Sequence, residues 1–434
     1  MITVIGTGTG APLPPDARTA LADAGLVVGA RRHLDAAGLP DGVERIVLGP
    51  LAPALDAIEA WCAAGGEGRS RIVVLASGDP GFFGIVRVLA ERFGSGALDV
   101  RAGVSSVAGA FARVGLEWDD AVVVSAHGRD LRTAVNVCRA HPKVAVLTGP
   151  GAGPAELGAE LAHATTGRTL VVATALGDPA RESVERVTPA EAAARDWGTA
   201  VSVVLCLETA RLTPDHTDLT DLAPHPTSGP VTIAGPRPGP DRWALEEDAF
   251  AHRDSMITKF EVRALALGRL GPRTGDLVWD VGAGSGSVAV ECARFGAAAV
   301  AVEKSADGVA RIRANAETHG VSVQAVHGSA PAVLAELPDP DAVFVGGGGA
   351  ELPAVVTACA LRARRAVVVA MAALDRVPAA RAALTGAGYT CDGVLLQSSR
   401  LAPLPGDVTR LAAANPVFLL WGTRPTPPLR GANL

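Results

Sequence analysis

The residues of this sequence that are best suited to chemistry lie in one glycine-rich segment, VWDVGAGSG. An apolar run there ends in Asp280, and small residues follow it. The glycines in this segment are Gly282, Gly284 and Gly286. Such glycines let a backbone approach a ligand closely and adopt φ values that other residues avoid. The next apolar run ends in Glu303, at about the spacing expected of an acidic residue that binds a ribose diol. The segment therefore predicts a cofactor loop between a strand and a helix.

The spacing of these glycines distinguishes between cofactors. A dinucleotide fingerprint reads G-x-G-x-x-G, whereas this loop reads G-x-G-x-G after an aspartate. The loop resembles the first motif of class I methyltransferases, which wraps the methionine and ribose parts of S-adenosylmethionine. An NAD-type loop and a purely structural glycine turn are the alternatives.

A second group of glycines opens the chain in the pattern G-x-G-x-G, at residues 6–10. Three prolines follow at once, Pro12, Pro14 and Pro15. Because they delay the next helix, its N-terminus cannot lie directly over a phosphate as a dinucleotide site requires. Taken alone, this loop predicts a structural turn as readily as a binding site.

Two later segments carry a resemblance to the tetrapyrrole methylase family: VVLASGDPGFFG and AGVSSVAGAFARVGLEWDDAVVVSAHGR. The resemblance covers residues 1–208 and implies S-adenosylmethionine in a cleft between two α/β lobes. The implied cofactor contacts are Gly78, Asp79, Pro80, Ser105, Ser106, Ala175, Leu176 and Gly177. Gly8 and Gly10 would lie beside the substrate. Ala175 departs from the family, in which an asparagine is common at that position.

His127 and Arg129 follow a predicted strand at its carboxyl end, where open α/β sheets bind ligands. The segment Ala-His-Gly-Arg resembles the branch of the family that acts late in corrin synthesis. We expect catalytic roles for both residues. The alternative for His127 is a loop histidine that only caps local structure.

The C-terminal half adds RDSMITK at residues 253–259, HGSAP at 327–331 and DAVFVGGGG at 341–349. Together these motifs resemble the decarboxylating corrin methyltransferases, from about residue 229 to residue 424. Candidates for substrate carboxylates or for closing the pocket are Arg253, Thr258, Lys259 and Arg263. We expect catalytic roles for the first three and substrate binding for Arg263. Expected cofactor contacts are Thr258, Asp280, Gly282, Gly284, Gly286, Glu303, Gly328, Ser329 and Ala330. Gly346 and Gly347 end a strand and are expected to line the substrate site, or else to form a loop without contacts. Lys259 and Arg263, spaced four apart, could equally form a solvated helix face.

Composition limits the partners of the chain. Its 434 residues are 48% hydrophobic but only 4% aromatic, and the net charge is −6, so there is no global basic field to attract nucleic acid. Six cysteines occur without a C-x-x-C pair, which favours buried thiols in a reducing compartment, with neither disulfides nor a metal site. No signal peptide and no membrane-length apolar run is evident. We expect a soluble, cytoplasmic protein, and the resemblance implies a homo-oligomer.

Apolar β-branched runs that end in polar glycine loops, with helical stretches between them, predict parallel α/β layers in both halves. Strands are expected at residues 1–5, 71–76, 121–125, 144–147, 169–174, 201–207, 277–281, 298–302, 321–326, 342–345, 366–371 and 415–421. Helical spacing is expected over 16–34, 259–270 and 287–295. We predict a two-lobed tetrapyrrole methylase domain at 1–208, a linker at 209–239, and a Rossmann-like class I methyltransferase domain at 240–424.

The two resemblances, in this order along the chain, imply a bifunctional enzyme of cobalamin biosynthesis. It would methylate a precorrin at C5 in the N-terminal half, and methylate C15 and decarboxylate the C12 acetate in the C-terminal half. Carbon methylation needs mainly alignment of the reacting atoms, which agrees with the absence of a recognisable nucleophile–base pair. Two alternatives stay open. The C-terminal half could methylate adenine in tRNA, or one half could bind S-adenosylmethionine without catalysing a reaction.

Overall fold

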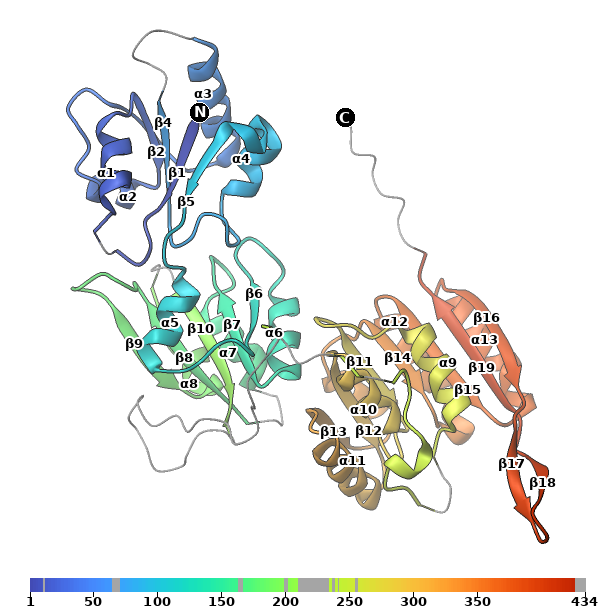
Figure 1. The fold of residues 1–434 in the computed structure, drawn as a ribbon. Helices are drawn as coiled ribbons and strands as arrows, with labels where there is room; N and C mark the ends of the chain where they lie inside the picture. The colour runs from blue at the N-terminus through green and yellow to red at the C-terminus, as the bar shows by residue number, and fades with distance from the viewer. Residues whose placement is uncertain are drawn as a thin grey trace. The chain divides into compact units, whose positions relative to one another are not determined.

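The computed structural model describes residues 1–10, 12–64, 71–162, 167–198, 202–209, 234–235, 239–240, 242–253 and 257–425. The chain divides into two compact units (Figure 1). The first holds residues 1–129, 145–159 and 169–235, and the second holds residues 130–144, 160–168 and 236–434. The predicted linker, 209–239, lies mostly outside the described residues.

The first lobe of the N-terminal unit is a parallel sheet in the order β3-β2-β4-β1-β5. Its strands are β1 (Ile2–Gly6), β2 (Leu26–Gly29), β3 (Glu44–Val47), β4 (Ile72–Ala76) and β5 (Leu98–Arg101). Its helices are α1 (Pro15–Ala22), α2 (Arg31–Ala36), α3 (Leu51–Ala63) and α4 (Val86–Phe93). Alternate strand residues face opposite sides, so Val74 packs with α3 and α4 while Val73 packs with α1 and α2. Figure 1 shows the resulting three layers.

The second lobe is a five-stranded sheet in the order β6-β7-β10-β8-β9, in which β9 runs antiparallel to β8. Its strands are β6 (Val122–Ser125), β7 (Lys143–Leu147), β8 (Arg168–Thr174), β9 (Ser183–Val187) and β10 (Ser202–Glu208). The helices along this part of the chain are α5 (Ser106–Val114), α6 (Leu131–Ala140), α7 (Pro154–Ala162) and α8 (Pro189–Ala193), of which α6 is grouped with the second compact unit. Helix α5 buries Val107 and Phe111 against the apolar face that β8 and β10 provide.

The C-terminal unit is built on a seven-stranded sheet in the order β13-β12-β11-β14-β15-β19-β16. Strands β11 to β15 are parallel, and β19 is antiparallel to both β15 and β16. The strands are β11 (Leu277–Val281), β12 (Ala298–Glu303), β13 (Val323–His327), β14 (Ala342–Val345), β15 (Ala366–Met371), β16 (Thr390–Leu396) and β19 (Val417–Thr423). Since the strand order reverses between β11 and β14, the loops that follow these two strands open at a topological switch point.

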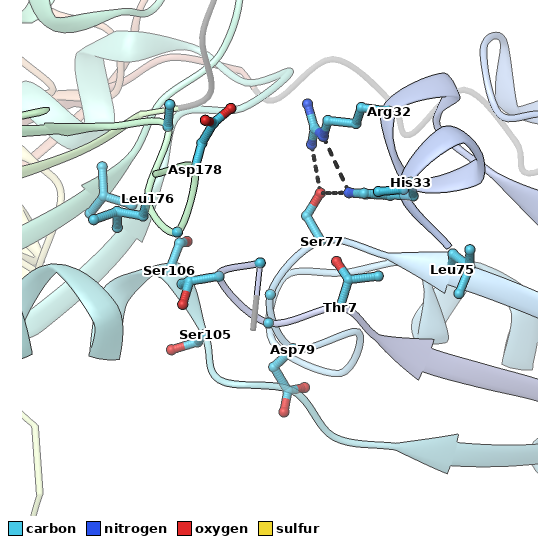
Figure 2. A pocket seen from close by; sticks show the side chains of 18 of the residues that line it. Thr7, Arg32, His33, Leu75, Ser77, Asp79, Ser105, Ser106, Leu176 and Asp178 are labelled. Atoms are coloured by element: carbon cyan, nitrogen blue, oxygen red, sulfur yellow. Dashed lines mark hydrogen bonds between the residues drawn. The ribbon is translucent and has the colours of Figure 1, made fainter. Parts of the chain in front are cut away.

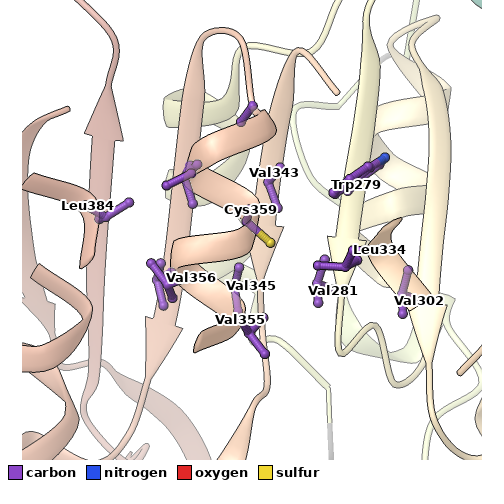
Figure 3. Close-up of a cluster of buried hydrophobic side chains, with 14 of the residues drawn as sticks. Trp279, Val281, Val302, Leu334, Val343, Val345, Val355, Val356, Cys359 and Leu384 are labelled. Carbon is purple, nitrogen blue, oxygen red and sulfur yellow. The ribbon is translucent and has the colours of Figure 1, made fainter. Parts of the chain in front are cut away.

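Helices cover both faces of this sheet: α9 (Phe260–Leu270), α10 (Ser287–Arg294), α11 (Ala306–Thr318), α12 (Leu352–Arg362) and α13 (Val377–Gly386). One face packs Trp279, Val345 and neighbouring valines against α12 and α13, as Figure 3 shows. The other face packs Val278, Phe344 and their neighbours against α9, α10 and α11. Strands buried on both faces read as continuous apolar runs, which is why they are visible in the sequence.

A two-stranded hairpin, β17 (Ser399–Leu404) and β18 (Val408–Ala413), extends away from the seven-stranded sheet (Figure 1, red). Its side chains are mostly exposed, including Leu401 at 78% and Leu411 at 67%. At its base, Arg400 pairs with Glu247 and with Glu261. These ion pairs join the hairpin to the segment that leads into α9.

Three expectations about structure were wrong. Residues 16–34 are not one helix but α1, the buried strand β2 and the start of α2. The sheets are not entirely parallel, because β9, β16 and β19 take part in antiparallel pairs. Cys62 is exposed, whereas Cys138, Cys206, Cys292 and Cys359 are buried as expected. Among the described residues, no helix has the length and apolar character needed to cross a membrane.

Candidate active sites

The predicted cofactor loop of the C-terminal unit lies at the switch point between β11 and β14. Gly282, Gly284 and Gly286 all have positive φ, at 74°, 56° and 73°. A side chain on Gly282 would begin only 2.9 Å from the backbone nitrogen of Gly347. The loop is held to β12 by a hydrogen bond of 2.9 Å from the amide of Gly282 to the carbonyl of Val302. The predicted residues Gly282 and Gly347 are therefore brought into direct contact.

Glu303 ends β12 beside this loop and accepts hydrogen bonds from two backbone amides. The amide of Gly284 donates to Oε2 at 3.0 Å, and the amide of Ser305 donates to Oε1 at 2.9 Å. A carboxylate has about four lone-pair sites, so each oxygen retains capacity to accept a ribose hydroxyl. The carboxylate is thus fixed in orientation by the loop that it borders.

Asp280 lies beneath the loop and is 1% exposed. Its Oδ2 accepts a hydrogen bond of 3.0 Å from the amide of Ala289, in the first turn of α10. Burial, with a smaller effect from the charge of Glu303, raises the pKa of Asp280 to about 7 against the lowering effect of that amide. Asp280 therefore supports the loop from its buried side. The backbone amides of the loop and Glu303 lie on the side that is available to a ligand.

The buried position of Asp280 predicts a pH-dependent stability. Since its pKa in the folded protein is raised from 3.8 to about 7, the folded state holds a proton that the unfolded state has released between these values. Stability that is present below about pH 4 is then lost as the pH rises towards 7. The melting temperature of the wild type should fall between about pH 5 and about pH 8. We expect this fall to be about 5 °C smaller in Asp280→Asn, whose side chain stays neutral.

Differential scanning calorimetry of the cofactor-free protein measures this difference. Asp307→Asn, which changes an exposed carboxylate in the first turn of α11, is the matched control and should leave the fall unchanged. An identical fall in wild type and Asp280→Asn would contradict the assignment.

The remaining predicted residues of this half lie at the same edge of the sheet. Gly328 follows β13 and donates a hydrogen bond of 3.0 Å to the carbonyl of Glu303, and Ser329 next to it is exposed. Ala330 follows in the same loop. Gly346 follows β14 and donates a hydrogen bond of 2.9 Å to the carbonyl of Val281. The loops after β11, β12, β13 and β14 therefore meet at one edge of the sheet, where the site is predicted.

Arg263 does not reach this site, so its predicted role in binding substrate carboxylates was wrong. Its side chain is fully buried and pairs with Glu291 at 3.3 Å, and Glu291 is fully buried as well. It also donates a hydrogen bond of 2.6 Å to the carbonyl of Thr258 and lies over the ring of Phe250. The alternative of a solvated helix face fails for the same reason. Arg263 holds the segment before α9 against α10.

The other residues predicted in that segment are only partly placed. Thr258 and Lys259 are half-buried, and Lys259 immediately precedes α9. Arg253 is exposed, and the residues after it, 254–256, lie outside the described residues. Roles for Arg253, Thr258 and Lys259 in catalysis, and for Thr258 in cofactor binding, stay predictions.

The N-terminal unit contains a cavity of about 720 Å³ between its two lobes. The predicted residues that line it are Gly8, Gly10, Gly78, Asp79, Ser105, Ser106, Ala175, Leu176 and Gly177. Figure 2 shows several of them around the opening. Pro80 is buried and is not part of the lining. The structure thus brings together residues that lie up to about 170 positions apart in the chain.

Close backbone contacts between loops form the floor of this cavity. A side chain on Gly177 would begin 1.0 Å from the carbonyl oxygen of Thr9, and one on Gly103 would begin 2.4 Å from the carbonyl oxygen of Gly78. Gly8 and Gly78 exchange backbone hydrogen bonds of 3.2 and 3.1 Å. Glycines are required because the loops after β1, β4 and β8 meet here at backbone distance.

Polar groups of the cavity have defined local partners. Asp79 Oδ1 accepts a hydrogen bond of 2.7 Å from the amide of Gly81. The Ser105 hydroxyl accepts from the amide of Ala108 at 3.1 Å and so caps α5, whereas Ser106 lies in the first turn of that helix. Ala175 adopts a φ of 46°, a conformation that asparagine tolerates better than alanine. This geometry explains why an asparagine is common at that position in the family that the sequence resembles.

His127 and Arg129 lie outside the residues that line the cavity. The Nδ1 atom of His127 is 3.3 Å from the carbonyl oxygen of Thr148, and Arg129 lies 5.5 Å from the centre of the Phe83 ring. Both side chains are exposed at the carboxyl end of β6. Their catalytic roles stay predictions.

Sequence reasoning missed a basic group on the cavity wall, formed by Arg32, His33 and Ser77. Arg32 and His33 begin α2, directly after the strand β2. The signal was present as GARRHL, two basic side chains after an apolar run. The prediction of one helix over residues 16–34 left no strand end before Arg32. The basic side chains were therefore not recognised as lying at the carboxyl end of β2.

Both sites fit S-adenosylmethionine by their own geometry. The C-terminal loop offers a glycine cradle beside an oriented carboxylate, which suits a ribose diol. The N-terminal cavity has the size of a cofactor site and combines glycine backbone with a few fixed polar groups. In the N-terminal unit, the helix after the first glycine loop begins only at Pro15, unlike the helix of a dinucleotide site.

Comparisons with known proteins match the two halves of the chain to two different families. The family described as tetrapyrrole (corrin/porphyrin) methylases matches residues 1–193, and the family described as precorrin methyltransferase domain matches residues 248–422. A precorrin-6Y C(5,15)-methyltransferase [decarboxylating] from Sinorhizobium sp is 37% identical over 81% of this chain and 79% of its own length.

Two shorter proteins each align with about two fifths of the chain. A probable cobalt-precorrin-6B C(15)-methyltransferase (decarboxylating) from Pyrobaculum calidifontis is 39% identical over 41% of this chain and 93% of its own length. A cobalt-precorrin-7 C(5)-methyltransferase from Salmonella typhimurium is 35% identical over 40% of this chain and 83% of its own length. The chain belongs to the family of S-adenosylmethionine-dependent precorrin-6Y C5,15-methyltransferases (decarboxylating).

Proposed function

We propose that this chain methylates a precorrin at C5 and C15 and removes the carboxyl group of its C12 acetate, in cobalamin biosynthesis. The observation that carries the proposal is the presence of two glycine-walled sites, each inside one compact unit and each of a different fold. We assign C5 to residues 1–208, and C15 together with the decarboxylation to residues 240–424. The existence of separate C5- and C15-specific relatives supports this assignment.

The chemistry requires the protein mainly to align reactants. S-adenosylmethionine would supply an electrophilic methyl group to an electron-rich meso carbon of the ring. The new carbon–carbon bond would form as the methyl–sulfur bond breaks, and the thioether would leave as S-adenosylhomocysteine. In the C-terminal unit, Glu303 and the loop from Gly282 to Gly286 fix the cofactor, with Asp280 supporting the loop from below. In the N-terminal unit, the loops at Gly78 and Gly177 define where a substrate can approach. Holding two reactants in line accounts for much of such a rate enhancement.

Decarboxylation places a different demand on the C-terminal site. Loss of carbon dioxide leaves an electron pair that the conjugated ring accepts, and a proton must then be delivered to the carbon. The protein must bind the ring with its acetate oriented and must exclude water from the site. Lys259 and Arg253 remain our candidates for contacts to substrate carboxylates from the segment before α9.

Product analysis tests the function directly. The purified full chain is incubated with S-adenosylmethionine and a ring-contracted precursor, in metal-free and cobalt-loaded forms, and the products are weighed by mass spectrometry. We expect gain of two methyl groups and loss of carbon dioxide with one of the two precursors. Unchanged masses with both precursors would refute the proposal.

The alternative of a tRNA methyltransferase has less support, because the net charge of −6 offers no phosphate-binding field. We propose that nucleic acid is not a substrate. Methyl transfer from labelled cofactor to unmodified tRNA by the full chain would overturn this.

We also propose that the enzyme works in the cytoplasm, where free cysteines such as those of this chain persist.

We propose that the chain forms a homo-oligomer through the β17–β18 hairpin and the edge strand β16. Exposed apolar side chains gather there: Val394, Leu395, Leu401, Leu404, Val408 and Leu411. Apolar side chains on an edge strand and a protruding hairpin favour association, and a second copy of the same surface can complete the contact with two-fold symmetry.

The double substitution Leu401→Glu and Leu411→Glu is expected to shift the protein to monomers, because these two residues are cross-strand partners on β17 and β18. Analytical ultracentrifugation measures the mass. Leu361→Glu, at a residue 66% exposed on α12, is the matched control and should leave the oligomer intact. Equal masses for the double variant and wild type would contradict an interface at the hairpin.

A further inference from the structure

The cavity of the N-terminal unit contains a cation whose partners are neutral. Arg32 donates a hydrogen bond of 2.6 Å from Nη2 to the hydroxyl of Ser77, and one of 3.2 Å from Nε to Nε2 of His33. Within the described part of the chain, Arg32 forms no ion pair with an acidic side chain. Figure 2 shows the three side chains meeting on one wall.

The imidazole in this group acts as a hydrogen-bond acceptor. Burial, with a smaller effect from the charge of Arg32, lowers the pKa of His33 to about 4. His33 is therefore neutral at physiological pH, and its Nε2 can accept from Arg32. Because the Ser77 hydroxyl also lies 3.2 Å from that nitrogen, the guanidinium is held from two sides in one orientation.

The other cation that lines the cavity is already paired, because Arg181 lies 2.6 Å from Asp178. The Asp79 carboxylate accepts a hydrogen bond from the amide of Gly81 and does not pair with Arg32. Burial lowers the pKa of Arg32, and the nearby charge of Arg181 adds to this. A guanidinium has five N–H donors, and Ser77 and His33 engage only part of that set. The remaining donors of Arg32 form an oriented binding site for an anion.

We propose that Arg32 binds one peripheral carboxylate of the tetrapyrrole and thereby positions the ring for methylation, as a substrate-specificity residue of the N-terminal site. This inference rests on the proposed function of that unit. A fixed, planar guanidinium matches a carboxylate through two parallel hydrogen bonds. His33 and Ser77 are positioning residues that hold it.

The position of Ser77 links this anchor to the cofactor loop. Ser77 contacts Arg32, whereas the next residue, Gly78, lies against the other wall, where a side chain on it would begin 3.4 Å from the amide of Ser106. Arg32 and the predicted cofactor contact Ser106 thus approach the stretch from Ser77 to Asp79 from opposite sides. A carboxylate held at Arg32 would therefore lie across the cavity from the predicted cofactor contacts Ser105 and Ser106.

Steady-state kinetics of C5 methylation by the full chain tests the proposal, with mass spectrometry to locate the methyl groups. Arg32→Ala is expected to raise KM for the precorrin by about 10- to 100-fold, the usual effect of losing a hydrogen bond to a charged group. The affinity for S-adenosylmethionine, measured by calorimetry, should not change, and C15 methylation should continue. Arg31→Ala, which removes the neighbouring exposed arginine outside the cavity, is the matched control and should behave as wild type.

Other outcomes would overturn the proposal in different ways. A KM for Arg32→Ala equal to that of Arg31→Ala would exclude a role in substrate binding. Weaker S-adenosylmethionine binding with an unchanged substrate KM would show that the anion is the carboxylate of the cofactor. If Arg32→Ala does not fold, Arg32→Lys keeps the charge without the planar fork, and an unchanged KM in that variant would refute bidentate binding. A wild-type chain that never methylates C5 would instead refute the proposed function of the unit.

Discussion

Gly177→Ala is expected to lower kcat/KM for C5 methylation by at least about 100-fold while C15 methylation persists. The new methyl group would begin 1.0 Å from the carbonyl oxygen of Thr9, and the backbone of residue 177 has a φ of 84°. No side-chain rotation can relieve a contact with a backbone oxygen, so one of the two loops must move. Both loops border the cavity, and a displacement of about 1 Å at a methyl-transfer site is enough for such a loss.

Gly151→Ala separates this displacement from simple backbone strain. Gly151 lies in the same unit with a φ of 73°, and a side chain there would meet nothing within 4 Å. It should cost about 1–2 kcal/mol of stability without a change in C5 methylation. Products are located by mass spectrometry after fragmentation. Comparable losses in the two variants would mean that strain, and not the contact with Thr9, is responsible.

Much of the C-terminal core could be predicted because its strands are buried on both faces. Ala342–Val345 and Ala366–Met371 read as uninterrupted apolar runs, and Leu277–Val281 is interrupted only by Asp280; the predicted bounds of all three agree with the structure. The glycine loop after the first of them was equally visible, since its conformations are closed to other residues. The sequence alone therefore predicted best the buried strands and the glycine loops on which the sites are built.

The missed features share a physical cause, because each depends on contacts distant in sequence. The strand Leu26–Gly29 has only four residues between helices, so periodicity cannot separate it from a helix. Arg263 looked like a helix-surface residue because its partner Glu291 is 28 positions away. The hairpin strands of residues 399–413 are exposed and carry no burial pattern. The basic group at Arg32 was missed because the strand that positions it, Leu26–Gly29, was not predicted.

Gly282→Ala is expected to abolish C15 methylation and decarboxylation, with a loss of at least about 100-fold. The added methyl group would begin 2.9 Å from the nitrogen and 3.0 Å from the Cα of Gly347, at a φ of 74°. The loop must then separate from either β14 or β12, where the amide of Gly282 donates to Val302. Either movement disturbs the hydrogen bond by which Gly284 orients Glu303.

Gly388→Ala is the matched control in this unit, with a φ of 85° and nothing within 4 Å of the new methyl group. It should retain full activity. Mixing Gly177→Ala with Gly282→Ala chains should restore the doubly methylated, decarboxylated product, because each variant keeps the site that the other lacks. If the mixture forms no such product although each variant binds S-adenosylmethionine, the two sites cannot act as independent catalysts on a released intermediate. Restoration would show that each site catalyses its own step, irrespective of the order in which the two carbons are methylated.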